Sequence, residues 1–180
     1  MKETMKVTGI VERRLFGPDG SPKKQFKGNA LWEALKNTVG KDLQIPFVTG
    51  YWTTAAIAHN TITSVGKKLM ADQLGGTVTT PATAIAIGIG TPGTTALGSE
   101  ITTNGGARGA ATVTNTTTTT TGDTEQWIKT FTFTGSFAIT EEGVFNNVSS
   151  GGIMVASQSF SAVNVNSGDS FQITHQIKFS

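Results

Sequence analysis

The sequence lacks several features that would point to a particular function. It has no cysteine and two histidines in 180 residues, so disulfide bonds and thiolate-ligated zinc are excluded, and His59 and His175 are the imidazole candidates. No run of about 18 apolar residues is present, so no membrane-spanning helix is expected. Residues 1–6 lead into no apolar segment, so we expect no secretory signal and a chain made in the cytosol.

Charge is also scarce. Charged residues make up 14% of the chain, and the net charge of +2 is too small to argue for nucleic acid. Residues 1–72 carry eleven of the fourteen Lys and Arg against six acids, whereas the remainder carries three against six. This basic half is either a solvated face or a surface that docks onto an acidic partner. Phe26 alone interleaves with Lys23, Lys24 and Lys27, so base stacking is not indicated and no nucleic-acid partner is expected.

Threonine and glycine take the place of the missing charges. Threonine occurs at about every sixth position and glycine at 22 positions, in a chain that is 37% hydrophobic. The branched Cβ of threonine favours a pleated, half-buried surface over a helix. The length is that of one ordinary domain, so the composition predicts a single all-β domain over residues 1–180 with one apolar core.

Residues 1–27 are predicted to form an N-terminal hairpin. Apolar and polar residues alternate along residues 5–16, Gly17-Pro18-Asp19-Gly20 supplies a turn, and residues 21–27 should return as the partner strand. The following segment, residues 28–59, is less regular. Its apolar spacing predicts a short helix over 29–37 with Asn29 as the candidate N-cap, and its residues 40–58 show no clear period.

Residues 60–75 are predicted to hold a second helix, over 61–74. Asn60 or Thr61 can cap its start, and Gly75-Gly76 ends it. Its apolar face comprises Ile62, Val65, Leu69 and Leu74. Such a helix should lie across an open side of the sheets.

Residues 77–180 are predicted to be the main strands, separated by turns at intervals typical of a sandwich or barrel. The last predicted strand has the clearest alternation, because its odd-numbered residues from Phe171 to Phe179 are apolar apart from His175, and the even-numbered ones are polar. The predicted strands are 84–89, 110–116, 125–134, 143–145, 153–160 and 170–179.

Six consecutive threonines, residues 116–121, precede Gly122-Asp123. The run is either an exposed loop tip or the extended end of a hairpin whose partner begins near Gln126. We favour the hairpin end. Both faces of such a strand carry the same side chain, so the run specifies its register poorly.

Each constellation that could carry catalysis has a simpler interpretation. Neighbouring residues in an extended segment point to opposite faces, so Glu141 and Glu142 cannot share a substrate bond and are interpreted as solvated turn acids. His175 has no acid at i±2 and is interpreted as a hydrogen-bonded core or interface histidine. His59 has no metal-binding companion at helical spacing and is interpreted as a loop histidine.

The glycine-rich segment at residues 88–93 is interpreted as a turn. It superficially resembles a phosphate loop, but Pro92 removes a backbone donor, no Lys-Ser/Thr follows, and no helix begins there. A Ser/His/Asp triad assembles in space and leaves no fixed spacing, so the sequence leaves that alternative open, although no Gly-x-Ser-x-Gly is present. We expect no enzyme activity, no cofactor and no metal.

Several blocks of this sequence occur together in a known group of proteins. The C-terminal blocks, which match most closely, are ITEEGVFN (139–146), SGGIMVA (150–156), FSAVN (160–164) and GDSFQIT (168–174), and earlier blocks are VTGIV (7–11), NTITSVGKKL (60–69), IAIGIGT (85–91) and TALGSEI (95–101). Together they resemble a group of tailed-bacteriophage virion proteins with the pattern TEAGLFN…GGTMLA…F…N…GD.L.ITW.I. The resemblance covers about four fifths of the chain. The chain departs from the group in the insertion at residues 28–59, and His175 replaces an aromatic residue.

The resemblance implies a β-sandwich, jelly-roll-like, with one or two short helices. It further implies a structural part of the virion, for which we expect a head decoration (cement) protein that binds the major capsid protein and forms a homo-oligomer. A tail, neck, baseplate or fibre subunit is the alternative in the same class. A carbohydrate-binding adhesion module is the alternative from another class, with Tyr51, Trp52 and Trp127 as its candidate aromatics.

The expected partner interface combines charge and aromatic anchors. Its basic residues, which would meet an acidic capsid surface, are Arg13, Arg14, Lys23, Lys24 and Lys27. Its aromatic residues, which lie in the insertion and should supply most of the binding energy, are Trp32, Phe47, Tyr51 and Trp52.

Overall fold

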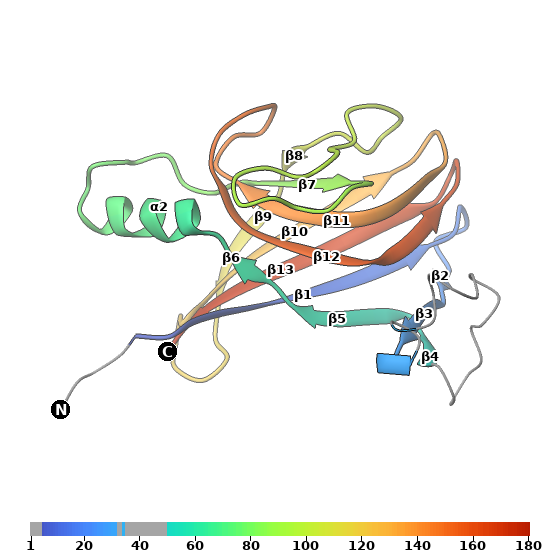
Figure 1. Ribbon diagram of the computed structural model, residues 1–180, viewed down its shortest axis with the longest axis horizontal. Helices are drawn as coiled ribbons and strands as arrows, with labels where there is room; N and C mark the ends of the chain where they lie inside the picture. The colour runs from blue at the N-terminus through green and yellow to red at the C-terminus, as the bar shows by residue number, and fades with distance from the viewer. Residues whose placement is uncertain (1–4, 32–33, 35–49) are drawn as a thin grey trace.

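The computed structural model describes residues 5–31, 34 and 50–180, and within these it is an all-β sandwich with one complete helix (Figure 1). The first sheet runs in the order β2 (Pro22–Lys23), β1 (Val7–Phe16), β13 (Ser170–Phe179), β10 (Thr124–Thr132) and β9 (Thr112–Thr116), and β5 (Ala55–His59) also pairs with β1. The second sheet runs in the order β6 (Thr61–Ile62), β12 (Met154–Val165), β11 (Phe137–Phe145), β7 (Ala84–Gly88) and β8 (Gly109–Ala110). A separate two-stranded ribbon joins β3 (Gln25–Gly28) and β4 (Gly50–Thr53).

The apolar core lies between the two sheets. In β13, Phe171, Ile173 and Ile177 are fully buried at alternate positions, as their period of two predicts. Further core residues are Val11 and Leu15 of β1, Phe131 of β10, Ile139 and Val144 of β11, and Val163 and Val165 of β12. The predicted strand over 170–179 is therefore confirmed, and its apolar face packs against the opposite sheet.

Both sides of the sandwich are spanned by chain that passes from one sheet to the other. At one side β5 continues through Asn60 into β6, and the Asn60 N–H donates to the Gly9 carbonyl at 3.2 Å. At the other side β8 continues through Ala111 into β9, and the Ala111 N–H donates to the Thr83 carbonyl at 2.8 Å. Such crossings reduce the open edge that each sheet presents to other chains.

The strand pairing is nested as in a jelly roll. The first half of the chain pairs with the second half in reverse order: β1 with β13, β6 with β12, β7 with β11, and β9 with β10. The sheets differ from a regular jelly roll because β6 and β7 lie in the same sheet. The expected jelly-roll-like sandwich thus takes the form of one long hairpin rolled into two layers.

The helix α2 (Ser64–Leu74) begins later than predicted. Thr63 caps it by accepting the Gly66 N–H at 2.8 Å, so the prediction of Asn60 or Thr61 as the cap was wrong. The reason is tertiary, because residues 61 and 62 pair with β12 as β6. The predicted end at Gly75-Gly76 is confirmed, with Gly76 at φ 68°. The predicted apolar face holds at Leu69, which is buried, but not at Leu74, which is 84% exposed.

The N-terminal hairpin is shorter than predicted. The turn at residues 17–20 is confirmed: Gly20, at φ 77°, donates its N–H to the Gly17 carbonyl at 2.9 Å. However, within the predicted return strand only residues 22–23, which form β2, pair with β1. Residues 25–28 pair with β4 instead. The cause is competition for one edge, since β5 occupies β1 from Ile10 to Arg14. Both β4 and β5 lie in the stretch that showed no clear period.

Two other sequence predictions are refined by the structure. Leu31 donates its N–H to Asn29 Oδ1 at 3.0 Å, and residues 30, 31 and 34 are helical, while the rest of the predicted helix over 29–37 lies outside the described residues. The strand predicted at 143–145 is the end of β11, and the strand predicted at 153–160 covers the first part of β12, so both observed strands are longer than predicted. In β11, the buried carboxylates Glu141 and Glu142 interrupt the alternation that would have predicted the full strand.

The threonine run lies at the tip of a hairpin, but residues 117–121 form an exposed loop and only Thr116 belongs to a strand, so the favoured interpretation as an extended strand end was wrong for these five residues. Thr116 is the last residue of β9 and pairs with Thr124, the first residue of β10. The intervening turn is held by Asp123, whose carboxylate accepts the backbone N–H groups of residues 118, 119 and 120 at 2.9 Å each. These backbone hydrogen bonds, that of Thr120 first, hold the pKa of the Asp123 carboxyl well below its usual range.

Candidate functional site

The structure separates the predicted basic residues into different environments. Arg13 lies on the inward face of β1, is 7% exposed, and places its guanidinium 4.0 Å from the centre of the Phe160 ring. Burial lowers its pKa to about 10, although the Glu142 carboxylate acts in the opposite direction. The prediction that Arg13 contacts a partner was therefore wrong. The physical reason is its position in the strand, because it shares the buried face with Val11 and Leu15.

Lys23 and Arg14 are both exposed in part and both paired within the chain. Lys23 Nζ lies 2.6 Å from Oδ1 of Asp169, a carboxylate that is 1% exposed, and so ties the N-terminal hairpin to the turn before β13. Arg14 forms an ion pair with Glu12 on its own strand. Lys23 is thus a stabilising contact of the fold, whereas Arg14 remains at the surface.

The remaining predicted residues that the structure describes lie on or next to the ribbon of β3 and β4, and we call them, together with the exposed Ile57 of β5, the ribbon patch: Lys24, Lys27, Tyr51, Trp52 and Ile57. Tyr51, Trp52 and Ile57 are 49%, 45% and 48% exposed. Lys27 connects Tyr51 and Ile57, since its Nζ lies 5.9 Å from the centre of the Tyr51 ring and donates to the Ile57 carbonyl at 3.1 Å. The ribbon of β3 and β4 lies beside β5, outside the two sheets (Figure 1). Trp32 and Phe47 lie outside the described residues.

Local pairing orients the aromatic side chains of the ribbon patch. In the β3–β4 register, Lys27 is opposite Tyr51 and Phe26 is opposite Trp52. The rings of Phe26 and Trp52 meet edge to face with centroids 5.4 Å apart. The two exposed aromatics therefore stand on opposite faces of the ribbon, each held by a neighbour from β3.

The edge of β5 beside this ribbon is partly covered. The Lys27 ammonium donates a hydrogen bond to the Ile57 carbonyl, and the Thr53 hydroxyl donates to the Ala55 carbonyl at 2.7 Å. Lysine and side-chain bonding at an edge strand hinder pairing with other chains. The patch therefore exposes side chains rather than a bare backbone edge.

A second group of residues, the interior cluster, connects the two sheets. His175 of β13 is fully buried, its Nδ1 lies 3.1 Å from Oε2 of Glu142 of β11, and its Nε2 contacts the Asn60 side-chain amide. The interpretation of His175 as a hydrogen-bonded core histidine is confirmed. Its acidic partner comes from the facing sheet, so no spacing in the sequence could have indicated it.

Gly9 has no side chain, and the space that this leaves is filled by Asn60 of the interior cluster. A Cβ at Gly9 would lie 2.2 Å from Asn60 Oδ1 and 2.5 Å from the Gln176 carbonyl. The side chain of Asn60 therefore lies where any larger residue of β1 would stand. The chain crossing at Asn60 and the hydrogen bond to His175 both depend on this glycine.

Glu141 and Glu142 point to opposite faces, as predicted, but neither is solvated. Both are fully buried, so their interpretation as solvated turn acids was wrong. The Glu141 carboxylate accepts the backbone N–H groups of Gly90 at 3.1 Å, Gly98 at 2.9 Å and Ser99 at 2.7 Å. These distant donors compensate the burial of the charge.

The same contacts support the interpretation of residues 88–93 as a turn rather than a phosphate loop. The Gly90 N–H that could meet a phosphate is donated to the chain's own carboxylate, and Gly93 donates its N–H to the Ala96 carbonyl at 2.9 Å. His59, interpreted as a loop residue, instead ends β5, where it is opposite Ile10. It is exposed, as a surface histidine would be.

Trp127 is buried and so is not available to a sugar, and its prediction as a candidate aromatic of an adhesion module was wrong. It is 5% exposed, and its Nε1 donates to the Ala82 carbonyl at 2.8 Å. Trp127 packs edge to face with His175, with centroids 6.2 Å apart. It is a core residue, and the hydrogen bond satisfies its polar atom.

Within the described part of the chain, no three His, Asp or Glu side chains gather so that they could hold a metal ion. The helix that is described there is too short and too polar to cross a bilayer. The chain matches no family model, no curated protein and no solved structure. The choice of a candidate functional site therefore depends on the structure of this chain. Of the two groups described, the ribbon patch is exposed and the interior cluster is buried.

Proposed function

We propose that this protein is a non-enzymatic structural component of a bacteriophage virion, a decoration protein that binds the major capsid protein on the outside of the head. The first support is the order of the sequence blocks that resemble virion proteins. The C-terminal blocks coincide with β11, β12, β13 and the turns between them. They are the strands that build the sandwich, so what the resemblance covers is the framework of this fold.

The observation that carries the proposal is the ribbon patch. Tyr51 and Trp52 are each about half exposed, and they lie on a two-stranded ribbon that stands outside both sheets. Tyrosine and tryptophan are the residue types that most often dominate the energy of a protein interface, at about 2 kcal/mol or more each. The ribbon presents them on its opposite faces, with Ile57 joined to Tyr51 through Lys27, so a partner protein that encloses the ribbon can contact both rings.

The charges around the patch favour an acidic partner. Lys24, Lys27 and Arg14 are the predicted basic residues that lie at or near this surface. Charges at the rim of an interface steer association and select the partner, while the aromatic anchors supply most of the affinity. Arg13 and Lys23 do not contribute to this surface, because their interactions lie within the fold.

The test is binding to empty capsids assembled from the cognate capsid protein. We expect the purified protein to sediment with capsids and to raise the temperature at which they disrupt. The double variant Tyr51→Ala/Trp52→Ala should lose at least about 3 kcal/mol of binding free energy, a factor of more than 100 in Kd. The control is Val113→Ala, which removes an exposed apolar side chain from β9 at the other side of the first sheet and should bind normally.

The outcomes separate the proposal from its alternative. Regular copies on the icosahedral shell in cryo-electron microscopy would support a decoration protein. Density confined to the neck, tail, baseplate or fibre would reject head decoration and favour the tail alternative. Binding to neither heads nor tails, by protein that is folded, would reject the virion proposal altogether.

A further inference from the structure

The edges of the two sandwich sheets differ in how far they are covered. The second sheet ends at β6 and β8, which are two residues long, and the edge of the first sheet at β5 is partly covered by Lys27 and Thr53. The other edge of the first sheet is β9, which is five residues long and has residues 112–115 exposed. Among the sheet edges that the structure describes, β9 is therefore the longest one left open.

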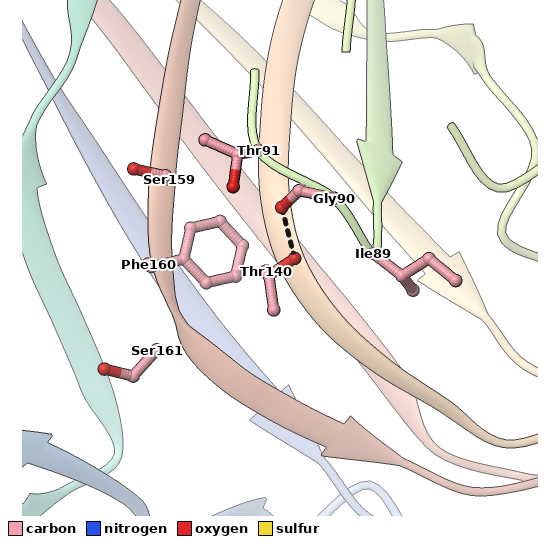
Figure 2. A pocket seen from close by; sticks show the side chains of 7 residues that line it. All are labelled: Ile89, Gly90, Thr91, Thr140, Ser159, Phe160 and Ser161. Atoms are coloured by element: carbon pink, nitrogen blue, oxygen red, sulfur yellow. Dashed lines mark hydrogen bonds between the residues drawn. The ribbon is translucent and has the colours of Figure 1, made fainter. Parts of the chain in front are cut away.

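The groove on the outer face of the second sheet offers less to a ligand. Its volume is about 590 Å³, and it is bordered by the loop after β7 and by the middle of β12. The Thr140 hydroxyl beside it donates to the Gly90 carbonyl at 2.7 Å, and the hydroxyls of Ser159 and Ser161 point away from Phe160 (Figure 2). A small-molecule site needs polar groups that converge on the ligand. The open edge of β9 is therefore the stronger indication of a partner.

The hydrogen-bond ladder shows which backbone groups β9 turns outward. The Phe133 N–H donates to the Asp169 carbonyl at 2.9 Å and extends the β10–β13 register, so the odd-numbered residues of β10 bond to β13. Bonding alternates along an antiparallel strand, so the even-numbered residues of β10 bond to the even-numbered residues of β9, which lie opposite them. Val113 and Asn115 therefore direct their N–H and C=O groups away from β10. Within the described part of the chain, no strand pairs with β9 on that side.

The sequence of β9, Thr-Val-Thr-Asn-Thr, lacks the features that hinder pairing at an edge. It contains no lysine, no other charged residue and no proline, and its register with β10 is free of bulges. The Asn115 side chain is turned back onto its own chain, where it donates to the Gly122 carbonyl at 3.1 Å and to the Glu125 carboxylate at 3.2 Å. The outward backbone groups of β9 are thus free to pair with another strand.

The same sequence is complementary to itself, because it has threonine at both ends and at its centre. When two copies pair antiparallel about a two-fold axis at Thr114, threonine lies opposite threonine along the outer face, and Val113 of each copy lies opposite Asn115 of the other. The outward backbone groups then form two opposed pairs with two hydrogen bonds each. Cross-strand threonine pairs are favourable, and no like charges face each other between the strands. A second copy is therefore the partner that fits this edge.

We propose that β9 pairs antiparallel with β9 of a second copy, so that the two first sheets join into one continuous sheet across a two-fold axis at Thr114. The ribbon patch lies at the opposite edge of the first sheet, so both ribbon patches stay open in the dimer. The inference goes beyond the virion proposal and does not depend on it. Strands of five residues bury little surface, and we expect a weak dimer with a Kd between about 10 µM and about 1 mM.

The first measurement is sedimentation velocity of the full chain from about 10 µM to about 1 mM, with amide hydrogen exchange at the same concentrations. We expect monomer to convert to dimer as the concentration rises. The amides of Val113 and Asn115 should exchange fast in dilute protein and become protected in the dimer, whereas the Thr114 amide, which is bonded to β10, should be protected throughout. This pattern distinguishes edge pairing from association through another surface.

The variants use the two-fold axis. Thr114→Lys places two lysines opposite each other in the dimer, and Thr114→Glu places two glutamates there, so each variant should dimerise at least about tenfold more weakly than the wild type. An equimolar mixture of the two variants pairs lysine with glutamate and should dimerise as well as the wild type or better. A substitution that only damaged the fold would not be rescued by mixing.

The matched control is Thr130→Lys, which makes the same change on the same face of the neighbouring strand β10. The hydroxyls of Thr114 and Thr130 each accept a glutamine side-chain amide at 3.2 Å, but Thr130 lies in a strand that is paired on both sides. Thr130→Lys should therefore dimerise as the wild type does.

A chain that stays monomeric at about 1 mM would overturn the proposal and leave the edge to a strand from a different protein. So would a dimer that Thr114→Lys and Thr130→Lys weaken equally, or one that the mixture of the two Thr114 variants fails to restore. The variant Tyr51→Ala/Trp52→Ala should dimerise normally, because its residues lie at the opposite edge. A wild-type dimer that binds no capsid would count against the virion proposal alone.

Discussion

Removal of the Glu141 carboxylate should open the loop that follows β7. The carboxylate is fully buried and is the shared acceptor for the N–H groups of Gly90, Gly98 and Ser99 at 2.7 to 3.1 Å. In Glu141→Ala these three donors lose their acceptor together. The loop lies on the outer face of the second sheet, so its release does not require the two sheets to separate.

The magnitude follows from the three stranded donors. A donor left unpaired in the interior costs about 1–3 kcal/mol, but Gly90 is half-buried and Gly98 and Ser99 are exposed, so water recovers part of this cost. We therefore expect Glu141→Ala to lower the free energy of unfolding by about 3–5 kcal/mol, a large part of the total for a domain of this size. Glu141→Gln keeps the shape and one acceptor oxygen, so it should lose about 2 kcal/mol.

Urea unfolding measures the global loss, and amide hydrogen exchange locates it. In Glu141→Gln, exchange at Gly90, Gly98 and Ser99 should accelerate more than exchange at β13. The control is Glu125→Gln, whose side chain is partly exposed and contacts Asn115 at 3.2 Å, and which should change stability by less than about 0.5 kcal/mol. A Glu141→Ala protein within about 1 kcal/mol of the wild type, with unchanged exchange in the loop, would refute the reasoning.

Three further perturbations test other contacts. Gly9→Ala should lower the free energy of unfolding by about 1–3 kcal/mol, because its Cβ would overlap Asn60, and thermal unfolding measures this. Asp123 has a lowered pKa, so the stability it contributes is complete above its unfolded value near 3.9 and is lost as pH falls further. The stability advantage of wild type over Asp123→Asn should therefore shrink below about pH 4 in urea titrations. Arg13→Ala should lower the free energy of unfolding by about 2–3 kcal/mol, because its packing on Phe160 is lost, and should leave the proposed capsid binding unchanged.

Controls and contrary outcomes follow from the same geometry. Gly93→Ala is the match for Gly9→Ala, because its Cβ would come no nearer than 3.4 Å to the Ala96 carbonyl, and it should be nearly neutral. Equal destabilisation by the two substitutions would contradict the role of Gly9 as space for Asn60. A constant stability difference for Asp123→Asn down to pH 2 would contradict a lowered pKa. Loss of capsid binding in a folded Arg13→Ala protein would indicate that Arg13 does take part in the interface.

Turn chemistry and strand period could be predicted from the sequence because both are local. The turn at residues 17–20, the helix end at Gly75-Gly76 and the alternating strand over 170–179 each depend on φ preferences or side-chain direction within a few residues. The all-β class follows from the same local preferences, summed over a chain rich in threonine. The exposed aromatics Tyr51 and Trp52 could also be selected, since no apolar period placed them in a core.

Tertiary structure alone decided which strands pair at the edge of β1 and which groups compensate the buried carboxylates. The strand after Lys23 leaves β1 because β5, which begins 32 residues later, takes that edge. Glu141 and Glu142 are buried because donors some 40 residues away and a histidine of the opposite sheet compensate them. From the sequence alone a carboxylate is expected at the surface unless its hydrogen-bond partners are known, and here those partners lie far along the chain. Local sequence sets backbone preference, whereas the balance of burial against long-range hydrogen bonding is settled only when the sheets close.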